Sequence, residues 1–400
     1  MNRFLTVVSV EEAVRTLQSL ASPPKPETVP LAGSLQRVLA EDVRSDSDIP
    51  GFDRSTVDGF AVLARDTVGA SDSLPALLYF RGRISMGSPP SVGIRTGECA
   101  YIPTGGVLPQ GADAVAMIEY SEQVEDQVLI QRPVAPGENV VQRGEDFARG
   151  SMILSRGHLL RPQDLGVLAA AGFTESAVYR NPRIGVISTG NELVPVDQDP
   201  RPGQVRDANS FMIQGFFAEH GCEPRRYGIV PDDPHLFREA LEHALPKSDA
   251  VIISGGSSKD VRDVCAQVIG ELGEVRIHGI SIQPGKPTII GKIGAIPVIG
   301  LPGHPASAYI VVRVLVTPLL ERMTGRSFPP VIASAVLAEN IPSPKGREDY
   351  VRVRLEEGKA IPLFGKSGLL NTLVQSEGMV RIPAGSEGLE AGEMVEVIRW

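Results

Sequence analysis

The sequence predicts a multidomain α/β protein. A central doubly wound, three-layer α/β domain follows an elongated N-terminal α/β region with a small β-rich subdomain, and precedes a C-terminal β-barrel. The chain has 400 residues, more than one hydrophobic core normally serves. Strand-like and helix-like segments alternate over residues 181–326, whereas short strand-like runs separated by Gly and Pro turns occur on either side. We therefore expect domains at 1–180, with the β-rich subdomain at about 60–145, at 181–326 and at 327–400.

The N-terminal region begins with an expected helix over residues 9–21, where Ser9 and Glu12 have capping-box spacing. The prolines of PPKPETVPL then indicate an extended linker. Three apolar runs, GFAVLA, ECAYIP and DAVAMIEY, predict strands of the β-rich subdomain. In RPQDLGVLAAAG, Pro162 favours the first turn of a helix and Gly172 favours its end.

The middle region alternates buried strands with helices, which is typical of a mostly parallel, doubly wound sheet. The expected strands are RIGVIS, RRYGIV, AVIIS, GISIQP, PTIIGKI and AIPVIG. Between them we expect helices capped by Asn209 and by Asp233, a helix over 261–272, and a long last helix that ends at about Met323. The runs ASAVLA, YVRVRLE, MVRIPAG and EMVEVIRW are then typical of a small β-barrel or sandwich.

Composition and charge exclude several function classes. A formal net charge of −9 argues against a general nucleic-acid binder. The run YIVVRVLVTPLL is interrupted by Arg313 and Pro318 and is too short to cross a bilayer, and the N-terminus lacks the pattern of a signal peptide. Cys99, Cys222 and Cys265 form no CxxC pair, and the six histidines show no zinc-ligand spacing. We expect a reduced, cytoplasmic chain with no nucleic-acid or membrane partner and no catalytic thiol.

Five turns of the middle region lie at or near the ends of expected strands, where ligands bind in open α/β sheets. They are STGNEL, PDDPH, SGGSSKD, PGKP and LPGHP. The third turn suits a phosphate, because its glycines allow close approach and a helix start adds partial positive charge. Its residues are Ser254, Gly255, Gly256, Ser257 and Ser258. An ordinary strand-to-helix turn explains them equally well.

Acidic side chains follow three of these strands. Glu192, Asp232 and Asp263 are explained either as helix caps and first-turn acids or as groups that attract a cation. Because the acids come from three separate strand ends, a hard cation such as Mg²⁺, bound by carboxylates and substrate phosphate, is a candidate ligand.

The two proline-containing turns hold polar groups in fixed directions. Lys286 lies between two prolines, so its direction is restricted, although a surface lysine is the alternative. The hydroxyl of Ser307, in the first turn of the last helix, suits an oxyanion. His304 has no evident partner, which is more typical of a structural role than of a general base. Its turn is stiffened by its neighbours Pro302, Gly303 and Pro305.

The N-terminal region offers fewer candidates. Asp58 at the entry of a strand and Thr104 in a TGG turn are candidate ligand contacts, whereas Asp113 more plausibly serves its own turn. Asp146 lies in QRGEDF, for which a surface loop held by salt bridges is the plain interpretation.

Eight motifs then occur in a fixed order. They are FDRSTVDGFAV, IPTGGVLPQGADAV, RGEDF, ISTGNELV, GIVPDDPH, SGGSSKDVRD, PGKPTIIGK and LPGHPASA. In this order they resemble the molybdopterin molybdenumtransferase family, which includes the MoeA proteins and the E domain of gephyrin. Each motif alone is weak, but the series is highly specific and covers nearly the whole chain.

The resemblance implies a four-domain transferase of molybdenum cofactor biosynthesis that works as an elongated homodimer. Such an enzyme takes adenylated molybdopterin and molybdate, cleaves the adenylate in a Mg²⁺-dependent step, and releases molybdenum cofactor and AMP. The implied cleft is formed by the α/β domain of one subunit and the β-rich subdomain of the other. The candidate partners are the molybdopterin adenylyltransferase and downstream cofactor-modifying proteins.

The resemblance also implies roles for individual residues. Asp263 matches the acid that supports adenylate cleavage and, with Glu192, binds the metal, and Asp232 matches an acid of the same cleft. The residues that match positions from the other subunit are Asp58, Thr104 and Asp146. The SGGSS turn and three residues of the LPGHP turn match substrate contacts, namely Pro302, Gly303 and Pro305. The positions around molybdate are Lys286, Ser307, Arg347 and Ser367. Charge-assisted hydrogen bonds from such groups suit an oxyanion.

Several residues depart from the family's usual pattern. Gln283 replaces a frequent lysine, His304 an asparagine, and Asp260 a glycine. Val264 stands where tyrosine is frequent, and Ala208 where the family has serine. Two alternatives therefore stay open, a non-catalytic carrier or scaffold for the cofactor and a paralogue that handles tungstate. The related adenylyltransferase activity is disfavoured by the additional N-terminal and C-terminal domains.

Overall fold

The computed structural model describes residues 7–255 and 259–400, and it describes no side chains over 259–263. The chain forms two compact units, which are treated separately below. The larger unit consists of Met1–Thr28, Gln36–Val38 and Ala177–Trp400, and the smaller of Val29–Leu35 and Leu39–Ser176. Within the described ranges, no helix is both long enough and apolar enough to cross a bilayer.

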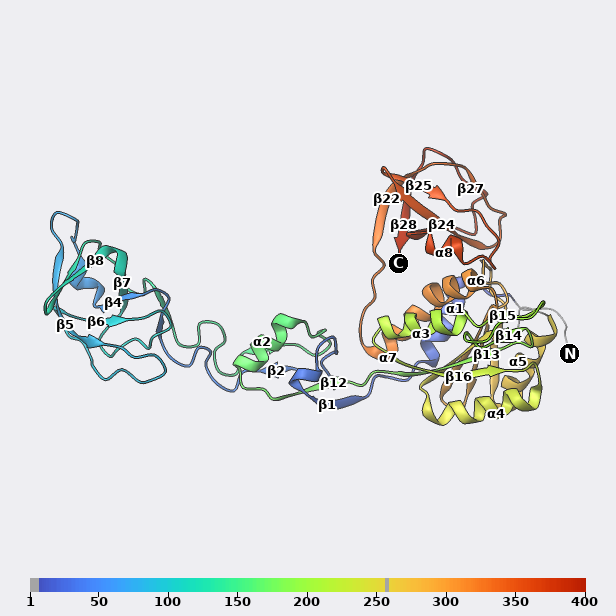
Figure 1. The fold of residues 1–400 in the computed structure, drawn as a ribbon, viewed down its shortest axis with the longest axis horizontal. Coiled ribbons are helices and arrows are strands. Elements are labelled where there is room, and N and C mark those ends of the chain that lie inside the picture. Colours follow the sequence, from blue (N-terminus) through green and yellow to red (C-terminus); the bar gives the residue numbers. More distant parts are fainter. Residues whose placement is uncertain (1–6, 256–258) are drawn as a thin grey trace. The chain divides into compact units, whose positions relative to one another are not determined.

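The α/β domain of the larger unit contains a six-stranded sheet in the order β16-β13-β17-β21-β20-β18. Figure 1 labels β13 and β16 among the helices of this domain. The strands of the sheet are β13 (Arg183–Thr189), β16 (Glu223–Val230), β17 (Ala250–Gly255), β18 (Glu274–His278), β20 (Ile289–Ile293) and β21 (Ile296–Leu301). The first four in spatial order are parallel, and the last three pair antiparallel. The apolar runs of β13, β17 and β21 are almost entirely buried, as central strands covered on both faces must be.

Helices cover both faces of this sheet and complete the three predicted layers. One face packs against α1 (Val10–Leu20), α3 (Asn209–Glu219), α6 (Pro305–Val311) and α7 (Thr317–Thr324). The other face packs against α4 (Pro234–Ala244) and α5 (Lys259–Leu272). A π-helical segment, Val312–Val316, joins α6 to α7, so the long last helix is irregular in its middle. The cap of α1 is confirmed, because Ser9 Oγ accepts a hydrogen bond from the Glu12 amide at 3.1 Å.

Two expectations about this domain are wrong. Of GISIQP, only Ile282–Gln283 (β19) is a strand, and it pairs with the barrel strand β24 (Glu348–Glu356) instead of the central sheet. The sheet position is taken by β18, whose short and charged sequence EVRIH gave little signal. Asn209 does not cap α3, since the helix begins at that residue and Asp207 Oδ1 accepts the Ser210 amide at 3.1 Å.

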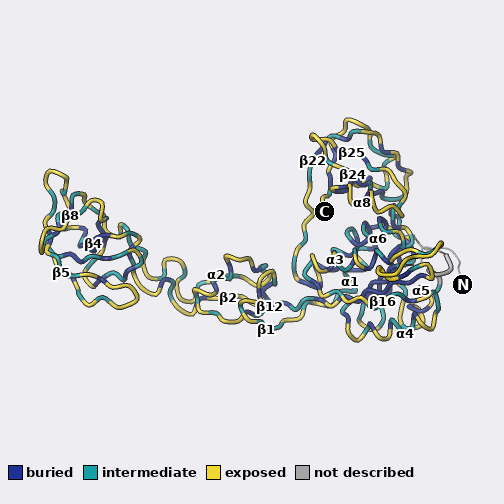
Figure 2. The backbone as a smooth tube through the Cα atoms, viewed as in Figure 1, coloured by how far each residue is buried: buried dark blue, intermediate teal, exposed yellow. Residues whose placement is uncertain are grey.

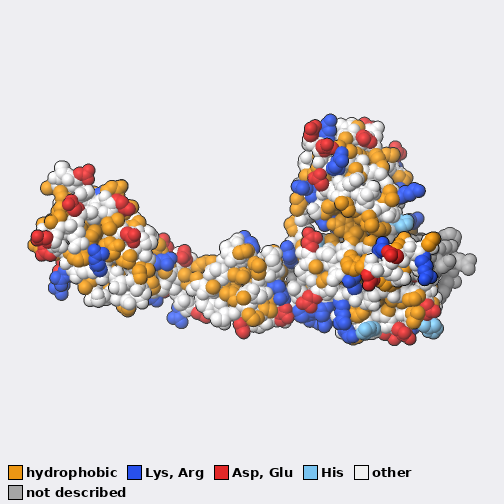
Figure 3. All heavy atoms as spheres, in the orientation of Figure 1, with side chains coloured by type: hydrophobic (Ala, Val, Ile, Leu, Met, Phe, Trp, Pro, Cys, Tyr) orange, Lys and Arg blue, Asp and Glu red, His pale blue; other side chains and the backbone are white. Residues whose placement is uncertain are grey.

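The C-terminal strands form a closed barrel, in the order β24-β25-β22-β28-β26 with β26 returning to β24. The other barrel strands are β22 (Ile332–Leu337), β25 (Lys359–Pro362), β26 (Gly378–Ile382) and β28 (Met394–Arg399). The C-terminal region also contains the short elements β23 (Ile341–Pro342), β27 (Gly388–Leu389) and α8 (Asn371–Val374), of which β23 pairs with β27. Tyr350, Met379 and Trp400 join the core shared with α1, α3 and α7, and Figure 3 shows hydrophobic side chains gathered where the barrel meets the α/β domain. The predicted fold class is therefore confirmed.

The smaller unit contains a six-stranded sheet in the order β7-β4-β6-β5-β9-β8. Its strands are β4 (Gly59–Val62), β5 (Ala76–Arg83), β6 (Glu98–Ile102), β7 (Ala114–Met117), β8 (Ser121–Val124) and β9 (Gln127–Ile130). Two cores lie on the sheet, and Figure 2 shows its buried inner strands. The predicted helix is present as α2 (Pro162–Ala170).

Short strand pairs complete the chain. The paired strands are β1 (Pro26–Pro30) with β12 (Glu175–Tyr179), β2 (Val43–Arg44) with β11 (Met152–Leu154), β3 (Arg54–Ser55) with β10 (Val140–Val141), and β14 (Leu193–Val194) with β15 (Val205–Arg206). The expected linker PPKPETVPL is thus extended, and part of it is paired.

Candidate functional site

The carboxyl ends of β13 and β16 are joined through an acid predicted for the site. The Asp232 carboxylate accepts hydrogen bonds from Thr189 Oγ1 at 3.1 Å and from the Asn191 amide at 3.2 Å. Asn191 Oδ1 accepts in return from the Asp232 amide at 3.1 Å. Asp232 therefore fixes the turn that carries Glu192, and the structure brings these two predicted acids to adjacent strand ends.

Glu192 is exposed, and its carboxylate lies over the same turn. A Cβ at Gly190 would lie only 2.6 Å from Glu192 Oε2. Neither oxygen of Glu192 has a hydrogen-bond or ion-pair partner in the part of the chain that the structure describes. Residues 7–255 and 259–400 contain no group of three or more His, Cys, Asp or Glu side chains suited to a metal among those described. Mg²⁺ is commonly held by one or two carboxylates together with substrate phosphate, so Glu192 fits a metal of that kind.

The predicted phosphate cradle after β17 is described as far as Gly255. This glycine has a φ of +141°, and a Cβ there would lie 1.9 Å from the Thr189 carbonyl oxygen. Only glycine allows that approach between the ends of β17 and β13. Ser254 is buried in the sheet between Ser188 and Leu301. The roles proposed for the remaining members stay predictions because they lie outside the described residues: Gly256, Ser257, Ser258 and the side chain of Asp263.

The LPGHP turn is held between helix α3 and the barrel. Asn209 Nδ2 donates to the Gly303 carbonyl at 2.8 Å. On the other side, His304 Nδ1 lies 2.8 Å from Ser367 Oγ, and the Ala306 amide donates to the Ser367 carbonyl at 3.1 Å. The structure thus gives His304 the partner that the sequence did not reveal. The other predicted members of this region are buried or half-buried: Pro302, Pro305 and Ser307.

Asp207 is a further polar residue that the sequence did not single out. It is buried, and its Oδ2 accepts a hydrogen bond from Ser188 Oγ at 2.7 Å while Oδ1 accepts the Ser210 amide. Asp207 therefore ties the end of β13 to the start of α3, and so supports the side chain of Asn209.

Two arginines of the barrel differ in their electrostatic environment. Arg347 Nε donates to Asp349 Oδ1 at 2.9 Å, so the charge predicted to face molybdate already has a buried carboxylate partner. Arg352 is only 6% exposed, and its Nε has no hydrogen-bond partner. Its Nη2 donates to the Gly365 carbonyl at 3.3 Å. Burial lowers the pKa of Arg352, and the described side chains include no carboxylate that pairs with it.

Arg352 is therefore a candidate site residue that the sequence reasoning missed. An unpaired buried cation is costly in free energy, so an anion is its expected partner. Because Gly365 is two residues before Ser367, this hydrogen bond joins Arg352 to the segment that carries the predicted hydroxyl. The alternation of YVRVRLE places Arg352 on the same side of β24 as Tyr350, which packs in the core shared with the α/β domain.

Lys286 is exposed in a turn that adjoins the same strand. The Ile280 amide donates to the Lys286 carbonyl at 2.9 Å and closes the turn. Gln283 pairs with Asp349 in the β19–β24 ladder, so the turn is anchored to the start of β24. The ammonium of Lys286 has no ion-pair partner among the residues described, and its charge is available to a ligand.

The smaller unit brings two predicted residues together. Asp58 Oδ1 accepts hydrogen bonds from the Thr104 amide at 2.7 Å and from Thr104 Oγ1 at 3.1 Å, and both residues are exposed. Asp146 is also exposed, and its amide donates to the Ile49 carbonyl at 3.0 Å. Its loop does contain a salt bridge, in which Arg143 Nε contacts Asp48 at 2.8 Å.

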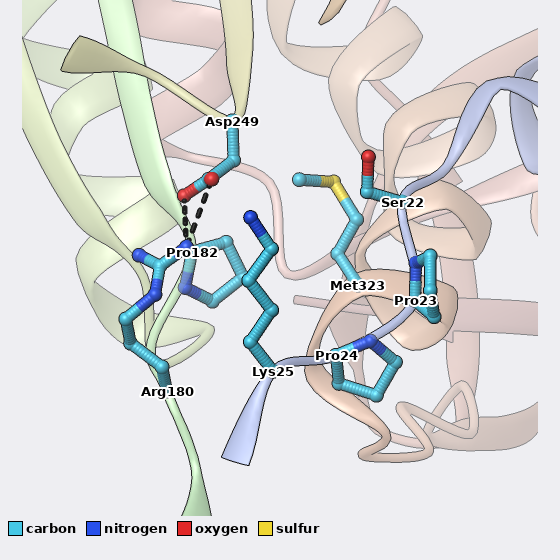
Figure 4. Close-up of a pocket in the computed structure, with 8 residues that line it drawn as sticks. All are labelled: Ser22, Pro23, Pro24, Lys25, Arg180, Pro182, Asp249 and Met323. Atoms are coloured by element: carbon cyan, nitrogen blue, oxygen red, sulfur yellow. Dashed lines mark hydrogen bonds and ion pairs between the residues drawn. The ribbon is translucent and has the colours of Figure 1, made fainter. Parts of the chain in front are cut away.

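Other reactive groups are accounted for by packing. Burial raises the pKa of Cys99, Cys222 and Cys265 each to about 12, which keeps the thiols protonated and unreactive. The pocket in Figure 4 is lined by Lys25, Met323 and an ion pair, and by none of the predicted site residues. In that pair Arg180 Nη2 donates to the two Asp249 oxygens at 2.8 and 2.9 Å. We therefore assign this pocket no part in the candidate site.

Comparisons with known proteins identify the family over most of the chain. Residues 8–172 match the MoeA N-terminal region (domain I and II), 185–322 a probable molybdopterin binding domain, and 334–400 the MoeA C-terminal region (domain IV). The chain is 35% identical over 382 residues to a putative molybdopterin biosynthesis protein of Methanocaldococcus jannaschii, covering 93% of this chain and 92% of that protein. It belongs to the MoeA family.

Two further MoeA-family relatives cover almost the full length. A molybdopterin molybdenumtransferase of Bacillus subtilis is 32% identical over 404 residues, with 98% of this chain and 94% of that protein covered. The crystal structure of a molybdopterin biosynthesis MoeA protein from Pyrococcus horikoshii superposes with a TM-score of 0.89 at 40% identity, covering 98% of this chain and 99% of that chain. The family resemblance stated from the eight motifs is thereby confirmed.

Proposed function

We propose that this MoeA-family chain is a molybdopterin molybdenumtransferase that acts in molybdenum cofactor biosynthesis. It inserts molybdate into adenylated molybdopterin and releases AMP in a Mg²⁺-dependent reaction. The observation that carries the proposal is the buried Arg352, which has no carboxylate partner among the described side chains and donates to the Gly365 carbonyl, two residues before Ser367. The ammonium of Lys286, on the turn anchored to the same strand, has no ion-pair partner among the described residues. Cationic and hydroxyl donors of this kind suit a tetrahedral oxyanion.

The acidic side of the site has a different task. Glu192 and Asp232 lie at adjacent strand ends of the α/β sheet, where ligands of such sheets bind. A Mg²⁺ ion held there would supply positive charge to the phosphates of the substrate. Glu192 offers free oxygens to hold it, while Asp232 keeps the turn of Glu192 in place. Asp263 is proposed as the further acid on the strength of the family resemblance.

The proposed cleavage breaks the phosphate anhydride that joins the pterin phosphate to AMP. Water supplies the oxygen and AMP is the leaving group, so the pterin retains its own phosphate.

We further propose that the enzyme is a homodimer, for which light scattering at micromolar concentration is the test. A predominantly monomeric protein of full activity would contradict the dimer.

The proposed function is tested by release of AMP from adenylated molybdopterin in the presence of Mg²⁺, with and without molybdate. We expect AMP release that requires both the metal and an oxyanion. A chain that binds the substrate tightly but releases no AMP above background is instead a carrier. The neutral, exposed Gln283 next to the turn of Lys286 favours this alternative. Tungstate in a parallel reaction distinguishes the tungstate-handling paralogue, which would turn over faster with that oxyanion.

A further inference from the structure

The side chain of His304 joins the LPGHP turn to the barrel loop through a hydrogen bond. Its Nδ1 lies 2.8 Å from Ser367 Oγ, and the histidine is exposed. The backbone of the turn is fixed independently of this contact. Asn209 holds the Gly303 carbonyl, and the Ala308 amide donates to the His304 carbonyl at 2.9 Å.

The backbone of Ser367 is also held without His304. Its carbonyl accepts a hydrogen bond from the Ala306 amide at 3.1 Å. The contact with the imidazole therefore restricts the rotation of the Ser367 hydroxyl, which the backbone hydrogen bonds do not fix. A serine hydroxyl has one proton to donate and two lone pairs.

The direction of the His304–Ser367 hydrogen bond decides what Ser367 offers to a ligand. If Ser367 donates to Nδ1, its only proton is used and its lone pairs face an approaching anion. If Nδ1–H donates to Ser367 Oγ, the hydroxyl proton is free for the anion. An oxyanion next to Ser367 therefore selects the form of His304 that carries a proton on Nδ1.

We propose that His304 is a positioning residue, which donates from Nδ1 to Ser367 Oγ and thereby directs the Ser367 proton to the bound oxyanion. The inference rests on the proposed function, because it assumes an oxyanion at Ser367. It assigns His304 no proton transfer in the reaction. His304 determines how tightly the oxyanion is held, and so affects the concentration of molybdate that the enzyme needs.

The test compares three substitutions at position 304 in the full-length chain. His304→Asn keeps an N–H group bonded to Cγ, at the place of Nδ1. His304→Gln moves its amide one bond further from the backbone, and His304→Ala has no donor. Sodium molybdate is the probe, and its dissociation constant is measured by calorimetry. The molybdate concentration for half-maximal AMP release and the saturated rate are measured alongside.

We expect His304→Ala and His304→Gln to bind molybdate about fivefold more weakly, as expected for one neutral hydrogen bond, with the saturated rate retained. His304→Asn should bind molybdate within about twofold of the wild type. Ser367→Ala should weaken binding, and adding His304→Ala to it should weaken binding no further, because His304 acts only through that hydroxyl.

Different failures of this test have different meanings. Wild-type protein that binds no molybdate overturns the proposed function, and the role of His304 with it. Wild-type protein that binds molybdate, with His304→Ala binding it equally well, overturns only the positioning role. The positioning role is also overturned if His304→Asn binds molybdate as weakly as His304→Ala. It is overturned likewise if the losses of molybdate affinity in His304→Ala and Ser367→Ala add in the double variant. Melting temperatures of all variants identify a loss that comes from unfolding alone.

Discussion

Replacing Arg352 with methionine removes a guanidinium that is 6% exposed and makes one hydrogen bond, at 3.3 Å, to a carbonyl of the barrel loop. Methionine fills a similar volume without charge. We expect the dissociation constant for molybdate to rise about 10- to 100-fold, because hydrogen bonds from a charged donor contribute roughly 1.5–3 kcal/mol. Without ligand, the variant loses only one long hydrogen bond to a carbonyl and is relieved of an unpaired buried charge, so its melting temperature should not fall.

Arg347→Gln is the matched control for this experiment. Arg347 pairs with the buried Asp349, whose other oxygen accepts Ser343 Oγ at 2.9 Å. Removing Arg347 leaves that carboxylate without its cation, so we expect Arg347→Gln to lower the melting temperature and to leave molybdate affinity nearly unchanged. Calorimetric titration with sodium molybdate and thermal unfolding without ligand measure both properties for both variants. Unchanged molybdate affinity in Arg352→Met, or a large loss in Arg347→Gln, would refute the assignment of the oxyanion to Arg352.

Three further outcomes follow from the described contacts. Gly255→Ala should lower the free energy of unfolding by about 2–3 kcal/mol in urea titrations, since its Cβ would meet the Thr189 carbonyl at a positive φ; an unchanged midpoint would contradict this. Asp249→Asn should cost about 2 kcal/mol of stability at pH 7. Burial alone would raise the pKa of Asp249, but the hydrogen bond from Arg180 helps to lower it overall. The stability that the Asp249 carboxylate contributes is therefore present above about pH 4, and it is lost as the pH falls through the lowered pKa. The free energy of unfolding should therefore fall less steeply with decreasing pH in Asp249→Asn than in the wild type. Equal slopes in the two proteins would contradict the role of Asp249. Asp232→Asn replaces one acceptor of the turn with a donor and should lower kcat/KM for AMP release about tenfold, whereas wild-type kinetics would show that the turn does not need it.

Local signals in the sequence were sufficient for much of the fold. Ser9 and Asp233 cap their helices as predicted, and Asp233 Oδ1 accepts the amides of His235 at 2.8 Å and Leu236 at 3.1 Å. A helix cap depends on a few neighbouring residues, so a single sequence can reveal it. Asn209 failed as a cap because Asp207, two residues earlier, accepts the helix amide instead. Two capping candidates so close together cannot be ranked by residue type alone.

Long-range pairing explains what the sequence could not reveal. Ile282–Gln283 has a strand-like sequence, but its partner is a barrel strand more than sixty residues later, and no local pattern indicates that choice. For the site, the contact of Asp58 with Thr104 joins residues 46 positions apart. Arg347 was predicted as a site residue from the family motif. Arg352 was not, because its lack of a carboxylate partner depends on which side chains the fold brings close to it. Burial and pairing of a charge are tertiary properties, and they become visible only in the structure.

We propose that this chain couples molybdate insertion to cleavage of the adenylate. The most direct measurement is a single-turnover reaction with enzyme in excess over adenylated molybdopterin, in which AMP and protein-bound molybdenum are counted together. We expect one AMP and one molybdenum atom per substrate molecule with molybdate and Mg²⁺ present, and neither product when the metal is chelated. AMP release without retained molybdenum, or bound molybdenum without AMP release, would contradict the claim.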